Sequence, residues 1–312
     1  MLLRPVTNCL SHAPESNTLV TVTQWLPSVP GHNPRVDLAE LQTRQRLALW
    51  LDGRTGLQSV GDAMQFIRDV AIALRYGAAS NLPVASMYRA TQRQVPSPEE
   101  EKSAHARAFE LTNGLLASGQ VVEINLIANR LCLAYESVMP AVYALRRGHI
   151  EPQLSDSAQQ AIEFIEANGS GTSGDVRRLL KVEGQPRPDA ADLALGELQR
   201  ELLVDRGPAG GPSTGVFYLT REGYPYRVFA NSHPGIVESA SRLARQQAAD
   251  ALLSQYLEAA VFATRRKLAS LFQLLVSPDE IDAAVRSLTE RGLVESLRVE
   301  KTDVIICRDR YT

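Results

Sequence analysis

Residues 172–205 read TSGDVRRLLKVEGQPRPDAADLALGELQRELLVD. Thr172 or Ser173 is a helix N-cap residue and predicts a short helix that runs through Leu180. Gly and Pro at positions 184–188 predict a turn, and a third helix is expected over 189–201, with leucines 193, 195, 198 and 202 inside. Residues 202–205 then favour a strand. The stretch therefore predicts helix, turn, helix and strand in close succession.

The flanking residues complete a recognisable unit. Ser155 begins an amphipathic helix that ends at Gly169. Residues 207–215 are rich in Gly and Pro and carry no charge, as expected for a hairpin tip, and residues 216–219 read as the returning strand. Three helices followed by a strand, a loop and a strand indicate a winged helix-turn-helix domain over 151–232.

The pattern recurs near the C-terminus. Helices are expected over 250–263, 264–271 and 277–292, then strands over 293–297 and 303–307 around a tight turn at 300–302. This repeat predicts a second winged helix over 233–312. The expected fold class is therefore mainly α with small β-wings, built from tandem winged helix-turn-helix domains.

The N-terminal half gives a weaker pattern. Residues 1–37 contain five prolines and one strand-like stretch, which suggests an extended arm. Residues 38–150 favour a helical domain, winged helix-like in its alternative reading, with helices expected over 59–76, 97–118 and 125–147. The 125–147 helix is expected to be kinked at Pro140.

Composition excludes several classes. The 312 residues contain 33 Lys and Arg against 35 Asp and Glu, a net charge of −2, which excludes a protein that coats nucleic acid by bulk positive charge. Cys9, Cys132 and Cys307 are scattered and the five histidines are isolated, so neither a metal site nor a cofactor is expected. With no signal-peptide pattern and no membrane span in the sequence, a cytoplasmic protein is the expectation.

Winged helices bind duplex DNA by placing the third helix in the major groove and the wing on the backbone. Within 172–206 there are six basic and seven acidic residues, so the first unit is poorly equipped for phosphate contacts. Arg265, Arg266 and Lys267 form the one local basic run, which is either a phosphate clamp or a solvated helix face. The candidate DNA-binding residues are Thr172, Ser173, Arg177, Arg178, Arg187, Arg200, Arg221, Arg265, Arg266 and Lys267.

Residues 154–229, with a helix that runs into Leu-Leu-Val at 202–204, resemble the middle winged helix of the AlkZ-like bacterial proteins, and residues 82–90 resemble a further segment of that family. The resemblance implies a DNA glycosylase that acts on alkylated or crosslinked bases through a Gln-x-Gln or Gln-x-Asp motif. Gln92-Arg93-Gln94 has the right letters, but it follows the second segment instead of preceding it, and its middle residue is charged. This departure implies a non-catalytic relative.

Three hypotheses follow. The first is a winged helix protein that binds duplex DNA, or a partner on DNA, without catalysis. The second is a DNA glycosylase in which Gln92 or Gln94 orients water. The third is a protein-interaction module whose acidic third helix binds another protein.

Overall fold

The computed structural model describes residues 37–51, 56–77, 82–92, 98–148, 151–208 and 223–308. Most of the expected arm, Gln94, Arg221 and the expected strand over 216–219 lie outside these residues. All of the described residues belong to one unit, Val36–Thr312.

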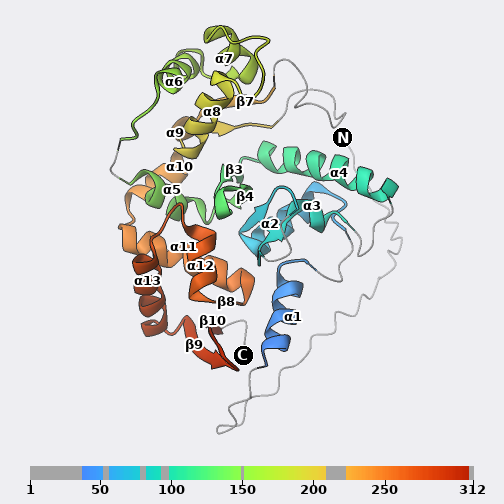
Figure 1. Ribbon diagram of the computed structural model, residues 1–312, viewed down its shortest axis with the longest axis vertical. Coiled ribbons are helices and arrows are strands. Elements are labelled where there is room, and N and C mark those ends of the chain that lie inside the picture. Colours follow the sequence, from blue (N-terminus) through green and yellow to red (C-terminus); the bar gives the residue numbers. More distant parts are fainter. Residues whose placement is uncertain are drawn as a thin grey trace, which may run out of the picture. The chain divides into compact units, whose positions relative to one another are not determined.

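One order of elements occurs three times along the described chain: helix, short strand, helix, helix, strand, strand (Figure 1). Unit 1 contains α2 (Val60–Val70), β1 (Ile72–Leu74), β2 (Ala85–Ser86), α3 (Met87–Ala90), α4 (Pro98–Ala117), β3 (Val121–Asn125) and β4 (Leu131–Tyr135). Unit 2 contains α6 (Asp156–Asn168), β5 (Gly171–Thr172), α7 (Ser173–Leu179), α8 (Ala190–Arg200), β6 (Val204–Arg206) and β7 (Pro225–Val228). Unit 3 contains α11 (Arg245–Ala260), β8 (Phe262–Ala263), α12 (Arg265–Phe272), α13 (Pro278–Glu290), β9 (Val294–Val299) and β10 (Thr302–Cys307).

The sheets repeat as well. In each unit the last strand lies between the other two, in the orders β1-β4-β3, β5-β7-β6 and β8-β10-β9, and these pairings are antiparallel. Unit 1 adds β2, which pairs parallel to β1. The loop between the last two strands is called the hairpin loop of its unit below. The described chain is thus mainly helical with small, mostly antiparallel sheets.

The backbone turns sharply at equivalent points of the three units. The residue after the first helix has a positive φ in each: 55° at Ala71, 73° at Gly169 and 67° at Val261. The third helix is likewise followed by a positive φ at Gly119, Leu202 and Gly292. Such a residue ends a helix by reversing the local backbone hand, which lets a strand begin within two or three residues.

Helix starts follow the local sequence closely. Ser59 with Asp62, Thr172 with Asp175, and Ser277 with Glu280 each form a reciprocal capping box. The helix expected over 97–118 is α4, and the short helix expected from Thr172 is α7. These predictions are confirmed because a capping side chain satisfies orphan N–H groups without help from tertiary contacts.

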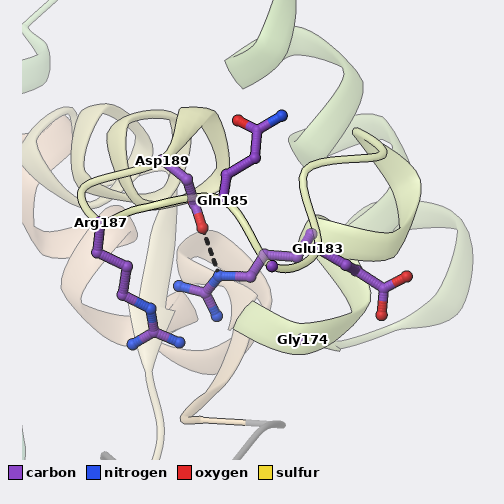
Figure 2. Close-up of a pocket in the computed structure, with 7 residues that line it drawn as sticks. Gly174, Glu183, Gln185, Arg187 and Asp189 are labelled. Atoms are coloured by element: carbon purple, nitrogen blue, oxygen red, sulfur yellow. Dashed lines mark hydrogen bonds and ion pairs between the residues drawn. The ribbon is translucent and has the colours of Figure 1, made fainter.

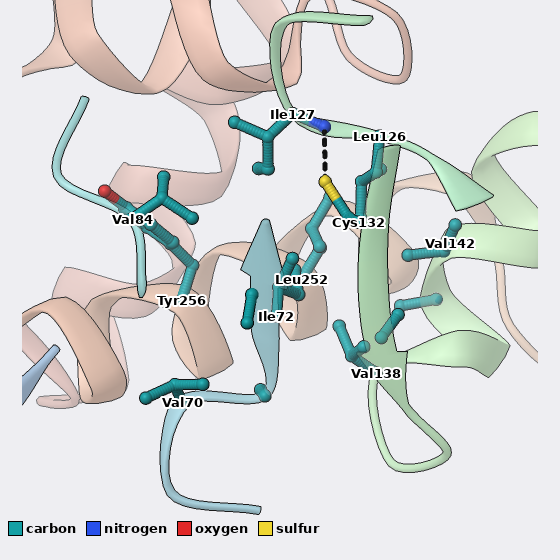
Figure 3. Packing of buried hydrophobic residues seen from close by; sticks show 14 of the residues in the cluster. Val70, Ile72, Val84, Leu126, Ile127, Cys132, Val138, Val142, Leu252 and Tyr256 are labelled. Carbon is teal, nitrogen blue, oxygen red and sulfur yellow. Dashed lines mark hydrogen bonds between the residues drawn. The ribbon is translucent and has the colours of Figure 1, made fainter. Parts of the chain in front are cut away.

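Helices α1 (Leu38–Ala48), α5 (Met139–Arg147), α9 (Phe229–Ser232) and α10 (Pro234–Ser241) and the short η1 (Ile127–Asn129) lie outside the repeats. Units 1 and 3 share one hydrophobic core, in which Ile72 and Cys132 of unit 1 pack near Leu252 and Tyr256 of α11 (Figure 3). The Tyr256 hydroxyl donates to the Pro83 carbonyl at 2.9 Å. Unit 2 has a separate core around α6, α7 and α8.

Four expectations about elements are wrong. The helix expected over 59–76 ends at Val70, and residues 72–74 are a fully buried strand. The helix expected over 125–147 is β4 followed by α5, which begins at Met139. The helix expected from 250 starts at Arg245, so Arg242 does not share its face. The first two errors arise because an apolar run that is buried on every side has no period to separate strand from helix. Leu193, expected inside, is 63% exposed.

Candidate nucleic-acid interface

Two of the predicted DNA-binding residues begin α7. The Thr172 hydroxyl accepts from the Asp175 backbone N–H at 3.1 Å and donates to the Asp175 carboxylate at 2.7 Å. Ser173 is the first helical residue, and its carbonyl accepts from the Arg177 guanidinium at 3.3 Å. The geometry of these two residues therefore serves the start of the helix.

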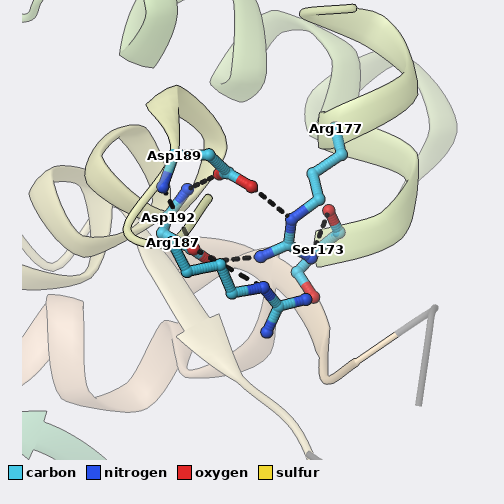
Figure 4. A network of polar contacts seen from close by, with 5 residues as sticks. All are labelled: Ser173, Arg177, Arg187, Asp189 and Asp192. Atoms are coloured by element: carbon cyan, nitrogen blue, oxygen red, sulfur yellow. Dashed lines mark hydrogen bonds and ion pairs between the residues drawn. The ribbon is translucent and has the colours of Figure 1, made fainter. Parts of the chain in front are cut away.

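Arg177 holds α7 and α8 together (Figure 4). Its Nε donates to Asp189 at 2.7 Å, another nitrogen pairs with Asp192, and the residue is 7% exposed. Burial of Asp189 opposes ionisation, but hydrogen bonds from the Asp192 backbone and from Arg177 lower its pKa below the ordinary value. The acids at the start of α8 are thus neutralised within unit 2, and Arg177 is poorly placed for phosphate contact.

The turn between α7 and α8 encloses a pocket of about 520 Å³ (Figure 2). Arg187 lines it with Arg177, Glu183 and Asp189, so two guanidinium groups face two carboxylates. Arg187 is mostly exposed and lies 3.9 Å from Asp192, while Arg178 pairs with Asp175. This pocket has no excess of either charge and no group poised for chemistry.

The third helix of unit 2 does not present a charged reading face. Only Leu193 and Arg200 of α8 are exposed. Near its C-terminal end, the Gln199 amide donates to the Glu123 carbonyl of unit 1 at 3.0 Å. In unit 3, α13 exposes Arg286 together with Asp279 and Glu290. Neither helix therefore carries the cationic face that phosphate binding requires.

The basic run over 265–267 lies at the start of α12, which Thr264 caps. Arg265 pairs with Asp282 at 2.9 Å. Arg266 is exposed, and Lys267 is half-buried. Gln92 lies two residues after α3, is half-buried, and donates its backbone N–H to the Arg89 carbonyl at 3.0 Å. No contact among the described residues joins Gln92 to a carboxylate or to another predicted site residue.

The largest concentration of buried charge joins units 1 and 2. Arg75, directly after β1, and Arg206, the last residue of β6, both pair with the Glu123 carboxylate of β3. Arg75 also donates to the Tyr224 hydroxyl at 3.0 Å, and the Arg206 guanidinium lies 4.2 Å from the centre of the Tyr224 ring. Arg75, Glu123, Arg206 and Tyr224 are called the Glu123 cluster below. Burial opposes the charge on Arg75, but the Glu123 carboxylate and the neighbouring tyrosines raise its pKa above the ordinary value.

The Glu123 cluster lies where the hairpin loops begin. Strand β1 runs antiparallel to β4, so Arg75 lies beside the start of β4 and receives Leu131 as its backbone partner at 3.0 Å. Arg206 ends β6, and Tyr224 directly precedes β7. The loop-bearing ends of the sheets in units 1 and 2 are thereby joined through one carboxylate.

A second carboxylate lies next to the cluster. Asp205 of β6 contacts His233 at 2.9 Å and accepts from Arg227 of β7 at 3.2 Å. The Arg227 side chain is 45% exposed. Arg130, in the hairpin loop of unit 1, is exposed as well. Four guanidinium groups, those of residues 75, 130, 206 and 227, thus share two carboxylates, which leaves an excess of positive charge at this end of the two sheets.

Sequence reasoning missed this cluster. Glu123 stands in the run Val121-Val122-Glu123-Ile124, and a lone acid within an apolar strand signals a buried, paired charge. Its two partners are 48 and 83 residues away along the chain. The signal could locate the acid but not its partners.

Within the described residues no group of three or more His, Cys, Asp or Glu side chains could hold a metal ion. Cys132 and Cys307 are buried free thiols. No described helix has both the length and the apolar character that a bilayer crossing requires.

The comparisons with known proteins agree on one family. The model of the "DNA glycosylase AlkZ-like" family matches residues 103–310, about two thirds of the chain. Among solved structures, the DNA glycosylase AlkZ of Streptomyces sahachiroi is similar, with a TM-score of 0.55 and 13% identity over 88% of this chain and 71% of that chain. A search of curated proteins finds no match. At this identity the structural likeness shows an AlkZ-like fold alone, whereas the family model covers more than half of the chain. The chain therefore belongs to the AlkZ-like DNA glycosylase family.

Proposed function

We propose that the protein binds DNA through the loop-bearing ends of three winged helix units, and that it does so without excising a base. In this proposal the units are the winged helix domains expected over 151–232 and 233–312, preceded by a third within 38–150. The repeated order of elements and the central last strand of each sheet support it. Family membership supports DNA as the partner.

The observation that carries the proposal is the excess of arginine at the Glu123 cluster. Arg130 and Arg227 are exposed there, while the third helices of units 2 and 3 lack a cationic face. Phosphate contacts supply most of the sequence-independent affinity of DNA-binding proteins. The wings of units 1 and 2, and not their third helices, are therefore the proposed contact surface.

Of the residues expected from sequence, those with exposed or half-buried side chains remain in the proposed contact set: Arg178, Arg187, Arg200, Arg265, Arg266 and Lys267. Arg177 is left out of it because its guanidinium is engaged by Asp189 and Asp192.

The test is a fluorescence anisotropy titration of a labelled duplex at several salt concentrations. Arg130→Ala and Arg227→Ala should each weaken binding and reduce the slope of log K against log salt by about one. Arg242→Ala is the matched control, since Arg242 is exposed and pairs with Glu238 on the surface of α10. Unchanged slopes for both variants would refute the proposed surface. Absence of any binding by the wild-type protein at low salt would refute DNA binding and leave a protein partner.

Base excision is the second candidate, and the family match favours it. An assay for base release from alkylated duplex DNA tests it directly. The proposal expects no release above the uncatalysed rate. Release that Gln92→Ala and Gln94→Ala together abolish would establish the glycosylase and the role of these glutamines.

A further inference from the structure

Tyr76 is an exposed aromatic side chain on a rigid support. It is 57% exposed, and it is the one aromatic residue among the large exposed hydrophobic residues of the described chain. The Arg75 guanidinium lies 5.3 Å from the centre of its ring. Arg75 is itself fixed by Glu123 and by the Tyr224 hydroxyl, so one side of the ring rests on a charge that cannot move away.

The backbone at Tyr76 is also held. Its carbonyl accepts from the Ser86 hydroxyl at 2.9 Å, and the Arg75 N–H donates to Leu131 at 3.0 Å. Burial of part of the ring raises the pKa of the phenol, which therefore stays neutral at physiological pH. A flat, neutral ring held in place loses little entropy when another ring stacks on it.

A small hollow adjoins the ring. It has a volume of about 170 Å³ and is lined by Leu74, Tyr76, Gly77, Arg130 and Leu131. Arg130 brings its charge to this hollow, and no described residue forms an ion pair with it. The hollow is smaller than the roughly 300 Å³ at which sites for drug-sized ligands begin. Its size and lining suit one flat ring with a phosphate near Arg130.

We propose that Tyr76 and Arg130 form a subsite for a single unpaired nucleobase, with Tyr76 stacking on the base and Arg130 contacting the adjoining phosphate. The proposal rests on the proposed DNA binding and adds a preference for DNA that contains an unstacked nucleotide over fully paired duplex. Aromatic stacking and a nearby cation are the two elements by which proteins bind unpaired bases without reading their sequence. Paired bases within a duplex expose no face to such a ring.

The experiment compares two labelled DNAs that differ only in one unpaired 2-aminopurine. Wild-type protein should bind the bulged DNA more tightly and quench the 2-aminopurine fluorescence. Tyr76→Ala should weaken binding to the bulged DNA by roughly 5- to 150-fold and abolish the quenching. Its affinity for the paired duplex should stay unchanged, and Tyr76→Phe should behave like the wild type. Leu47→Ala, a truncation of an exposed apolar residue on α1, is the control.

Because Tyr76 is exposed, its truncation should leave the melting temperature unchanged, which thermal unfolding verifies. If Tyr76→Ala retains the preference for the bulged DNA and the quenching, the subsite is refuted and DNA binding stands. If the wild-type protein binds both DNAs equally, the subsite is refuted in the same way. If it binds neither DNA at low salt, the proposed function fails and the subsite with it.

Discussion

Replacing Glu123 with Gln should strongly destabilise the protein. The Glu123 side chain is 0% exposed and is the shared counter-charge of Arg75 and Arg206, which are themselves almost fully buried. The glutamine amide keeps the size of the side chain but leaves two buried guanidinium groups without a carboxylate. Removing one partner of a buried ion pair costs about 3–5 kcal/mol. At roughly 2–4 °C for each kcal/mol, the melting temperature should fall by about 6–20 °C.

Thermal unfolding followed by circular dichroism at pH 7 measures the effect. Glu163→Gln is the matched control, because Glu163 is exposed and accepts only from Gln159 one turn away. Adding Arg206→Met to Glu123→Gln removes one of the stranded charges and should recover part of the loss. A melting temperature of Glu123→Gln within about 2 °C of the wild type would refute the view that this carboxylate holds the two sheets together.

Three further predictions concern single side chains. The hydrogen bond from Arg245, together with those from Ser277, holds the pKa of Glu280 at about 2 instead of 4.5. Its stabilising contribution is therefore complete above pH 4.5 and is lost as the pH falls toward 2, so the melting temperatures of wild type and Glu280→Gln should differ at pH 7 and converge near pH 2. Glu300 has a φ of 54° in the two-residue turn between β9 and β10, so Glu300→Gly should stabilise by about 0.5–1 kcal/mol in a urea titration, whereas Lys301→Gly, at an ordinary φ, should destabilise. A gain from Lys301→Gly equal to that from Glu300→Gly would contradict the role of the positive φ. Burial raises the pKa of Cys132 to about 12, so iodoacetamide at pH 8 should label it in urea but not in the native protein, as mass spectrometry of its peptide would show; rapid native labelling would contradict its burial.

The elements of units 2 and 3 could largely be predicted from sequence. Thr172, Asp189 and Ser277 are capping residues, and each begins a helix in the structure as the local pattern indicates. The tight turn over 300–302 was likewise predictable and is confirmed by the pairing of Val299 with Thr302. These features depend on contacts within three or four residues, which is why the sequence alone suffices.

Unit 1 could not be predicted in the same way. Residues 72–74 and 131–135 are apolar and buried, and they follow or precede helices without a Pro or a clear turn pattern between them. Their strand conformation comes from pairing with each other across about 60 residues of chain. Because β-pairing is a long-range interaction, local periodicity could not reveal it.

The candidate site shows the same division. The sequence by itself determined the family resemblance, the caps, and the residue types available, including the arginines on α7 and α12. Only the tertiary structure decided their use: it turned Arg177 inward onto two aspartates and brought Arg75, Glu123 and Arg206 together from three distant strands. The physical reason is that a buried charge must find its partner wherever the fold places one, and that partner is set by sheet packing and not by neighbours along the chain.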